Sequence, residues 1–102
     1  MLTQQDIKRY FDYDAEGGYL VWSLDRDGSL RGKIAGTTES SGRRIIKYRY
    51  KNYAEHILIW VLHHGYYPRY IYHINKNLSD NRIENLRAIG IKPQPQPKEI
   101  HV

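Results

Sequence analysis

Hydrophobic positions near the N-terminus recur at the spacing of a short amphipathic helix. Three of them stand at i, i+3 and i+4 and share one helical face: Ile7, Tyr10 and Phe11. Thr3 and Asp6 have the spacing of a capping box at the start of this stretch. The pattern predicts a helix over residues 4–11, followed by a turn over 13–18 and a strand over 19–22.

The densest hydrophobic segment lies in the middle of the chain, over residues 55–64. Its apolar residues cover too much of a helical surface for a helix that faces water. We therefore expect a central, largely buried helix, with His56 as a core histidine. Gly65 stands where a left-handed residue ends a helix, and Pro68 follows it.

The remaining segments alternate between short strands and polar loops. A long basic loop covers residues 23–42, with one short strand expected over 33–35. Residues 44–53 are expected to form a hairpin that turns at 49–51. A short strand is expected over 70–72, and a polar loop follows over 75–82.

The end of the chain is rich in proline. Ile83 and Leu86 are the last predicted core anchors. A helix that began after Leu86 would be cut short by Gly90 and the prolines behind it. Residues 93–102 are expected to form an extended polyproline II tail, which leaves residues 1–92 as a single domain.

Composition narrows the function classes. The chain has 102 residues and no cysteine, which excludes disulfides, zinc–cysteine clusters and a thiol nucleophile. No apolar run approaches the roughly 20 residues of a membrane span, and no signal-peptide core is visible, so we expect a cytoplasmic protein. The net charge of +5 favours an anionic partner such as nucleic acid, and the 10 tyrosines suit a contact surface.

Candidate chemistry concentrates after the strand at 70–72. His73 follows this strand, and Asn81 and Asn85 come eight and twelve residues later. The surrounding residues read Asp80-Asn81-Arg82-Ile83-Glu84-Asn85-Leu86-Arg87. With the upstream Tyr13-Asp14, Trp22 and His63-His64-Gly65, this pattern resembles the HNH endonucleases of the small phage and intron-homing branch.

The resemblance implies both a fold and a reaction. The fold would be α+β, with a ββα-metal half around the central helix and an N-terminal helix and β-hairpin module. The reaction would be one-metal hydrolysis of a phosphodiester with Mg²⁺ or Mn²⁺. His73 matches the general base, Asn85 the asparagine that orients its imidazole, and Asn81 an asparagine that shapes the loop.

Four positions depart from the family pattern. The metal-binding aspartate is replaced by Tyr72, and a neutral phenol is a poor ligand for a magnesium-like ion. The second ligand position falls on Gln94, between two prolines. A usual glycine is Lys76, and a usual arginine is Ile57. We therefore predict no metal ligands and no cofactor, unless the protein is active with Mg²⁺ or Mn²⁺.

Two sets of residues are predicted to bind DNA or a partner protein. The first is an aromatic and basic strip: Tyr67, Arg69, Tyr70 and Tyr72. The second is a basic hairpin: Arg43, Arg44, Lys47, Arg49 and Lys51. Lys47, Arg49 and Lys51 alternate along the sequence and would share one strand face. Arg82 and Arg87 are predicted to contact phosphates.

Two functions stay open at this point. The first is a catalytically impaired module that binds DNA or an acidic, nucleic-acid-handling protein. If the chain is phage-encoded, this would act in the host cytoplasm, for instance as an inhibitor of a host defence nuclease. The second is an active metal-dependent DNA endonuclease with His73 as its base. The exposed tyrosines would also suit a homodimer.

Overall fold

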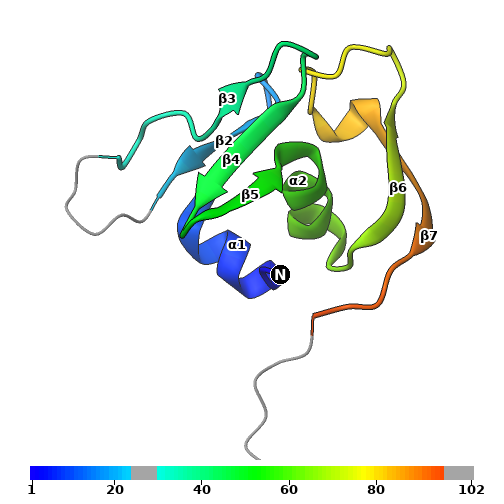
Figure 1. Ribbon diagram of the computed structural model, residues 1–102, viewed down its shortest axis with the longest axis horizontal. Helices are drawn as coiled ribbons and strands as arrows, with labels where there is room; N and C mark the ends of the chain where they lie inside the picture. Colours follow the sequence, from blue (N-terminus) through cyan, green and yellow to red (C-terminus); the bar gives the residue numbers. More distant parts are fainter. Residues whose placement is uncertain (24–29, 96–102) are drawn as a thin grey trace, which may run out of the picture.

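The computed structural model describes residues 1–23 and 30–95. The chain is α+β, with small antiparallel sheets arranged around one helix, α2 (Figure 1). The helices and strands are α1 Gln4–Tyr10, β1 Phe11–Asp14, β2 Tyr19–Trp22, β3 Thr37–Thr38, β4 Arg44–Tyr48, β5 Lys51–Ala54, α2 Glu55–His64, β6 Pro68–His73, the 3-10 turn η1 Ile83–Asn85 and β7 Leu86–Ile91.

The N-terminal helix and hairpin form as predicted. Asp6 N donates to Thr3 Oγ1 at 3.1 Å and Thr3 N donates to Asp6 Oδ2 at 3.0 Å, which completes the capping box. The turn is shorter than expected, because β1 already begins at Phe11 and pairs with β2 in the register Phe11↔Trp22. Phe11 and Leu20 are buried and belong to the core that surrounds α2.

The basic hairpin forms, but its basic residues do not share a face. β4 and β5 pair as Lys47↔Asn52 and Tyr48↔Lys51. Because paired residues point to the same side of a sheet, Lys47 and Lys51 lie on opposite faces. Arg49 lies in the two-residue turn at a positive φ. The prediction of one shared basic face is therefore wrong, because the turn is tighter than the sequence indicated.

The basic loop before this hairpin contains a different strand from the predicted one. Residues 33–35 form an isolated bridge only, Val21↔Ile34, while the strand β3 lies at Thr37–Thr38 and pairs with β4. Residues 24–29 of the predicted loop lie outside the described residues.

The central helix α2 has the predicted bounds. Leu58, Ile59 and Val61 are buried in the core. Gly65 ends the helix at φ 81°, and its N–H donates to Val61 O at 2.8 Å. Within the residues that the structure describes, no helix is long and apolar enough to cross a membrane.

The last strands form a hairpin that packs on α2. β6 extends beyond the predicted 70–72, and β7 occupies the residues where the sequence allowed a short helix, with His73↔Leu86 and Tyr70↔Ile89 among their pairs. Residues 92–95 have neither helix nor strand. The rest of the predicted proline-rich tail, 96–102, lies outside the described residues.

Candidate functional site

The site lies where the loop between β6 and β7 meets the start of α2. His73 ends β6, and its Nε2 lies 2.7 Å from Asn81 Oδ1. Asn81 Nδ2 in turn donates to Glu55 Oε1 at 2.9 Å. All of these side chains are buried, and Asn81 and Glu55 are fully shielded from solvent. The chain therefore links a strand end, a loop and a helix start through one buried polar network.

Glu55 fixes the orientation of the whole network. An ionised carboxylate only accepts hydrogen bonds, so the Asn81 amide must turn its NH₂ group to Glu55 and its oxygen to His73. That oxygen can only accept, so Nε2 of His73 must carry the proton. In the neutral imidazole, Nδ1 is then the nitrogen with the free lone pair. His73 is held in the form in which Nδ1 can accept a proton.

The buried charge of Glu55 is matched by Arg44 from β4. Arg44 Nε lies 3.1 Å from Glu55 Oε1, and Nη2 lies 3.3 Å from Oε2. Leu20 N also donates to Glu55 Oε2 at 3.1 Å, and Arg44 Nη2 donates to Ala35 O at 2.5 Å. These bonds offset the cost of removing two charges from water. Arg44 therefore supports the site from within, and its side chain is only 13% exposed.

A second histidine lies beside the base. The rings of His56 and His73 are 5.2 Å apart and meet edge to face. His56 is buried, as expected of a core histidine. Burial, together with the neighbouring His73 and Arg43, lowers the pKa of His56 from 6.5 to about 4. His56 is therefore neutral at physiological pH.

The two asparagines have exchanged the roles predicted for them. The Asn85 side chain directs its hydrogen bonds to the loop and not to His73. Its Nδ2 donates to Asp80 O at 2.8 Å and to Asn75 Oδ1 at 2.9 Å, and its Oδ1 accepts from Asn75 N at 3.0 Å. Asn85 thus closes the loop, while Asn81 orients the imidazole. The assignment of Asn85 as the orienting residue is wrong, because the loop brings the nearer asparagine to Nε2.

One comparison with known proteins identifies this region. Residues 53–91 match the model of the HNH endonuclease family. This segment is similar to the HNH endonuclease module. No curated protein and no solved structure matches the chain significantly. The match runs from the second half of β5 through β7, and it includes His73, Asn81 and Asn85.

The residues at the two positions where the family resemblance implies metal ligands, Tyr72 and Gln94, do not fit a magnesium-like ion. Tyr72 offers a phenol and is 51% exposed. The Gln94 amide is occupied by the backbone of Tyr67, since Tyr67 N donates to Oε1 and Nε2 donates to Tyr67 O. In residues 1–23 and 30–95, no group of three or more His, Asp or Glu side chains could hold a metal ion.

Asp80, a carboxylate in the loop between β6 and β7, is already paired. Asp80 accepts from Arg82 Nε and Nη2, both at 2.8 Å, and from Asn75 Nδ2 at 2.8 Å. The Arg82 guanidinium, assisted by Asn75, lowers the pKa of Asp80 to about 2. Arg82, one of the predicted phosphate contacts, is therefore committed first to this ion pair, and Asp80 is not a spare metal ligand.

The remaining predicted contact residues differ in exposure. Tyr67 is buried, and its hydroxyl donates to Leu2 O at 2.6 Å, so it serves the core rather than a surface strip. Arg44 is likewise held by Glu55. The exposed members are Arg43, Lys47, Arg49, Lys51, Arg69, Tyr70, Tyr72 and Arg87. Arg49 packs over the Tyr48 ring at 5.4 Å, and Arg87 Nη1 donates to Leu86 O at 2.7 Å.

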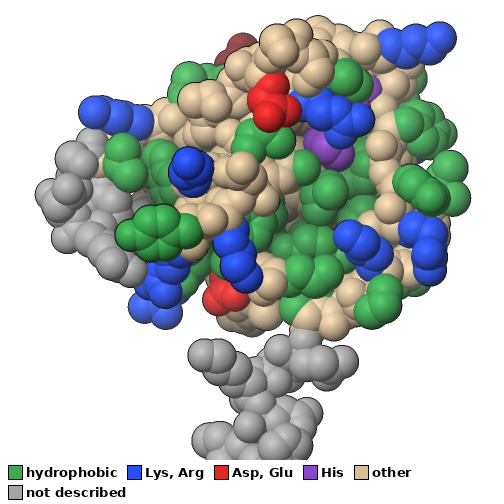
Figure 2. Space-filling model, viewed as in Figure 1, with side chains coloured by type: hydrophobic (Ala, Val, Ile, Leu, Met, Phe, Trp, Pro, Cys, Tyr) green, Lys and Arg blue, Asp and Glu red, His purple; other side chains and the backbone are tan. Residues whose placement is uncertain are grey.

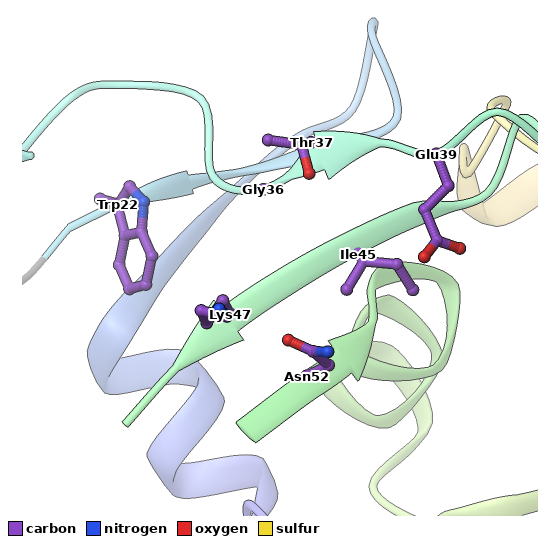
Figure 3. A pocket seen from close by; sticks show the side chains of 7 residues that line it. All are labelled: Trp22, Gly36, Thr37, Glu39, Ile45, Lys47 and Asn52. Atoms are coloured by element: carbon purple, nitrogen blue, oxygen red, sulfur yellow. The ribbon is translucent and has the colours of Figure 1, made fainter. Parts of the chain in front are cut away.

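An open hollow of about 500 Å³ lies away from this network, on the outward face of β4 (Figure 3). Its lining residues are Trp22, Gly36, Thr37, Glu39, Ile45, Lys47 and Asn52. Lys47 shares the hollow with the carboxylate of Glu39. The predicted basic surface is therefore mixed in charge on this side of the sheet.

The sequence pattern missed Glu55 as a member of the site. An acidic residue in the first turn of a helix is ordinarily explained by the helix dipole. The available signal was the combination of an acidic residue at the start of a largely apolar helix with an arginine on the first strand of the hairpin before it, since a buried carboxylate needs a partner.

Proposed function

We propose that the HNH module binds DNA and that its metal-assisted cleavage is impaired. The observation that carries this proposal is the replacement of both metal ligands by neutral side chains, Tyr72 and Gln94, the second of which is held by the backbone. The positive net charge and the exposed arginines and lysines support binding to a phosphate backbone. His73 and Asn81 are explained as the retained scaffold of the ancestral site.

Cleavage is the second candidate, and one observation favours it. The network keeps Nδ1 of His73 available as a proton acceptor, which is the property that a general base requires. A module that had lost all selection for chemistry would not need this tautomer. The proposal and its alternative therefore differ in one respect: whether the protein still cleaves DNA by a reaction that requires His73.

The test combines cleavage with binding. Supercoiled plasmid is incubated with the protein and Mg²⁺ or Mn²⁺, and His73→Ala controls for contaminating nuclease. Binding to a labelled duplex is measured between 50 and 200 mM salt. We expect no His73-dependent cleavage and an affinity that falls at least about tenfold across this range.

Each outcome decides one part of the proposal. Cleavage that disappears in His73→Ala overturns the claim of impaired catalysis. Binding that is absent, or that ignores salt, overturns the claim of DNA binding and favours an acidic, nucleic-acid-handling protein as the partner. That protein would be a host defence nuclease if the chain is phage-encoded. Tyr72→Asp supplies a matched variant, because it returns a carboxylate to the metal position.

A further inference from the structure

The hairpin of β6 and β7 has one covered face and one open face. On the covered side, Ile71, His73 and Leu86 point toward α2 and are buried or half-buried. The pairing Tyr70↔Ile89, Tyr72↔Arg87 and Pro68↔Ile91 places the alternate residues on the other side. The large side chains on this outer face are 51 to 67% exposed: Tyr70, Tyr72, Ile89 and Ile91.

This outer face combines apolar area with positive charge. Figure 2 shows hydrophobic side chains along the edge where Figure 1 places β6 and β7, with Lys and Arg side chains beside them. Neither strand contains an acidic residue, and Arg87 lies on the outer face opposite Tyr72. A second copy of the chain would meet this face with the same positive charge, whereas an anionic partner complements it.

We propose that the outer face of β6 and β7 binds a single-stranded segment of nucleic acid, with bases stacked on Tyr70 and Tyr72. This rests on the proposed DNA binding and specifies its substrate as unpaired or locally opened DNA. Aromatic side chains on the open face of a sheet are a general platform for unstacked bases. Two residues along a strand are about 7 Å apart, a spacing that an extended single strand can follow.

In this arrangement the apolar residues of the face contact the bases, and the charged residue contacts the phosphates. Ile89 lies opposite Tyr70 and extends the flat apolar surface under a base. Arg87 lies opposite Tyr72 on the same face, so its guanidinium can approach a phosphate at the margin. A paired duplex hides the faces of its bases, and it therefore gains nothing from the two tyrosines.

The experiment compares binding of a single-stranded and of a double-stranded DNA probe. Fluorescence anisotropy measures binding of a labelled 12-nucleotide oligothymidine and of a labelled duplex at one fixed salt concentration. The variants are Tyr70→Ser, Tyr72→Ser and their combination. Tyr50→Ser is the matched control, because Tyr50 is fully exposed in the turn between β4 and β5. Circular dichroism checks that each variant is folded.

We expect each substitution to weaken binding of the single strand about tenfold, and the pair about a hundredfold. Tyr50→Ser and all duplex affinities are expected to change less than about threefold. Tyr72→Phe should keep the affinity for the single strand, because a phenyl ring still stacks.

Three results would overturn the inference. The first is single-strand binding that is unchanged in the double variant. The second is a concentration-dependent dimer in sedimentation that the double variant abolishes, which would assign the face to a second copy. The third is no single-strand binding alongside intact duplex binding, which would leave the proposed function standing. Loss of both single-strand and duplex binding in the unmodified protein would instead remove the proposed function itself.

Discussion

His73 Nε2 and Asn81 Oδ1 lie 2.7 Å apart, and this contact determines which nitrogen of the imidazole is free. The relationship depends on Glu55, because the carboxylate takes the amide hydrogens of Asn81. A residue far from the loop in sequence therefore sets the chemistry of the histidine. The consequence can be observed on the ring itself.

Neutral His73 is expected to carry its proton on Nε2. Long-range ¹H–¹⁵N spectra of the histidine rings at a pH above neutrality report the tautomer directly. We expect the Nε2–H form for His73 in the intact protein. A dominant Nδ1–H form would contradict the orientation that Glu55 imposes on Asn81.

Asn81→Ala is expected to lower the free energy of unfolding by about 2 to 3 kcal/mol. The substitution leaves a buried carboxylate oxygen and a buried imidazole nitrogen without their shared partner, and each lost bond has a desolvation cost. Urea denaturation measures the change. Asn52→Ala is the control, because Asn52 is exposed on β5; it should change stability by less than about 1 kcal/mol. Equal effects at the two positions would mean that the network adds no stability.

Arg44→Met is expected to cost about 3 kcal/mol, near the lower end of the range for a broken buried ion pair. Glu55 then stays buried with hydrogen bonds from Leu20 and Asn81 but without a countercharge. Arg43→Met removes the same charge from the neighbouring, exposed position and should cost less than about 0.5 kcal/mol. Similar losses in both variants would argue against a stabilising role for the Arg44–Glu55 pair.

The sequence predicted those helices whose start or bounds are specified by their own residues and by residues next to them. The run of apolar residues before Gly65 gave the bounds of α2, and the capping box of Thr3 and Asp6 gave the start of α1. Resemblance to the HNH pattern pointed to His73 and Asn81, whose side chains the structure brings into contact. In each case the information is local, or it resides in a short motif with fixed spacing.

The sequence could not predict contacts that depend on how the chain returns on itself. Asn81 and Asn85 both lie within reach of His73 by spacing alone, and only the closed loop brings Asn81 to Nε2. The sequence allows only a helix cut short by Gly90 after Leu86, whereas pairing with β6 makes residues 86–91 a strand. Glu55 has no local feature that marks it as buried, since its partners come from three other segments.

Stability is expected to depend on pH through His56. Its pKa is about 4 in the folded protein, mainly because of burial, against 6.5 for an ordinary histidine. Between these values the unfolded chain binds more protons than the folded one, so stability falls as the pH falls from 6.5 toward 4. The stabilisation is fully present above pH 6.5, and the loss should reach about 2 to 3 kcal/mol.

Urea denaturation of the intact protein and of His56→Gln across this pH range tests the dependence. The variant should show a flatter profile, because glutamine does not titrate. His64→Gln is the matched control, since it makes the same substitution at an exposed position at the end of α2. An unchanged slope in His56→Gln would assign the pH dependence to other groups.

Lys76→Gly is expected to stabilise the protein by about 0.5 to 1 kcal/mol. Lys76 has a φ of 63°, in the left-handed region, where a Cβ atom costs roughly 1 to 2 kcal/mol. Glycine adopts this conformation freely, but it loses more conformational entropy on folding than lysine does. This entropy loss cancels part of the stability gained by relieving the strain. Lys51→Gly is the matched control, because it removes one exposed lysine from the extended strand β5 and should destabilise the protein by about 0.5 to 1 kcal/mol. Urea midpoints that move in opposite directions in the two variants would show that the backbone conformation at residue 76, not the lost charge, governs the effect. A decrease of the midpoint in both variants would refute this explanation.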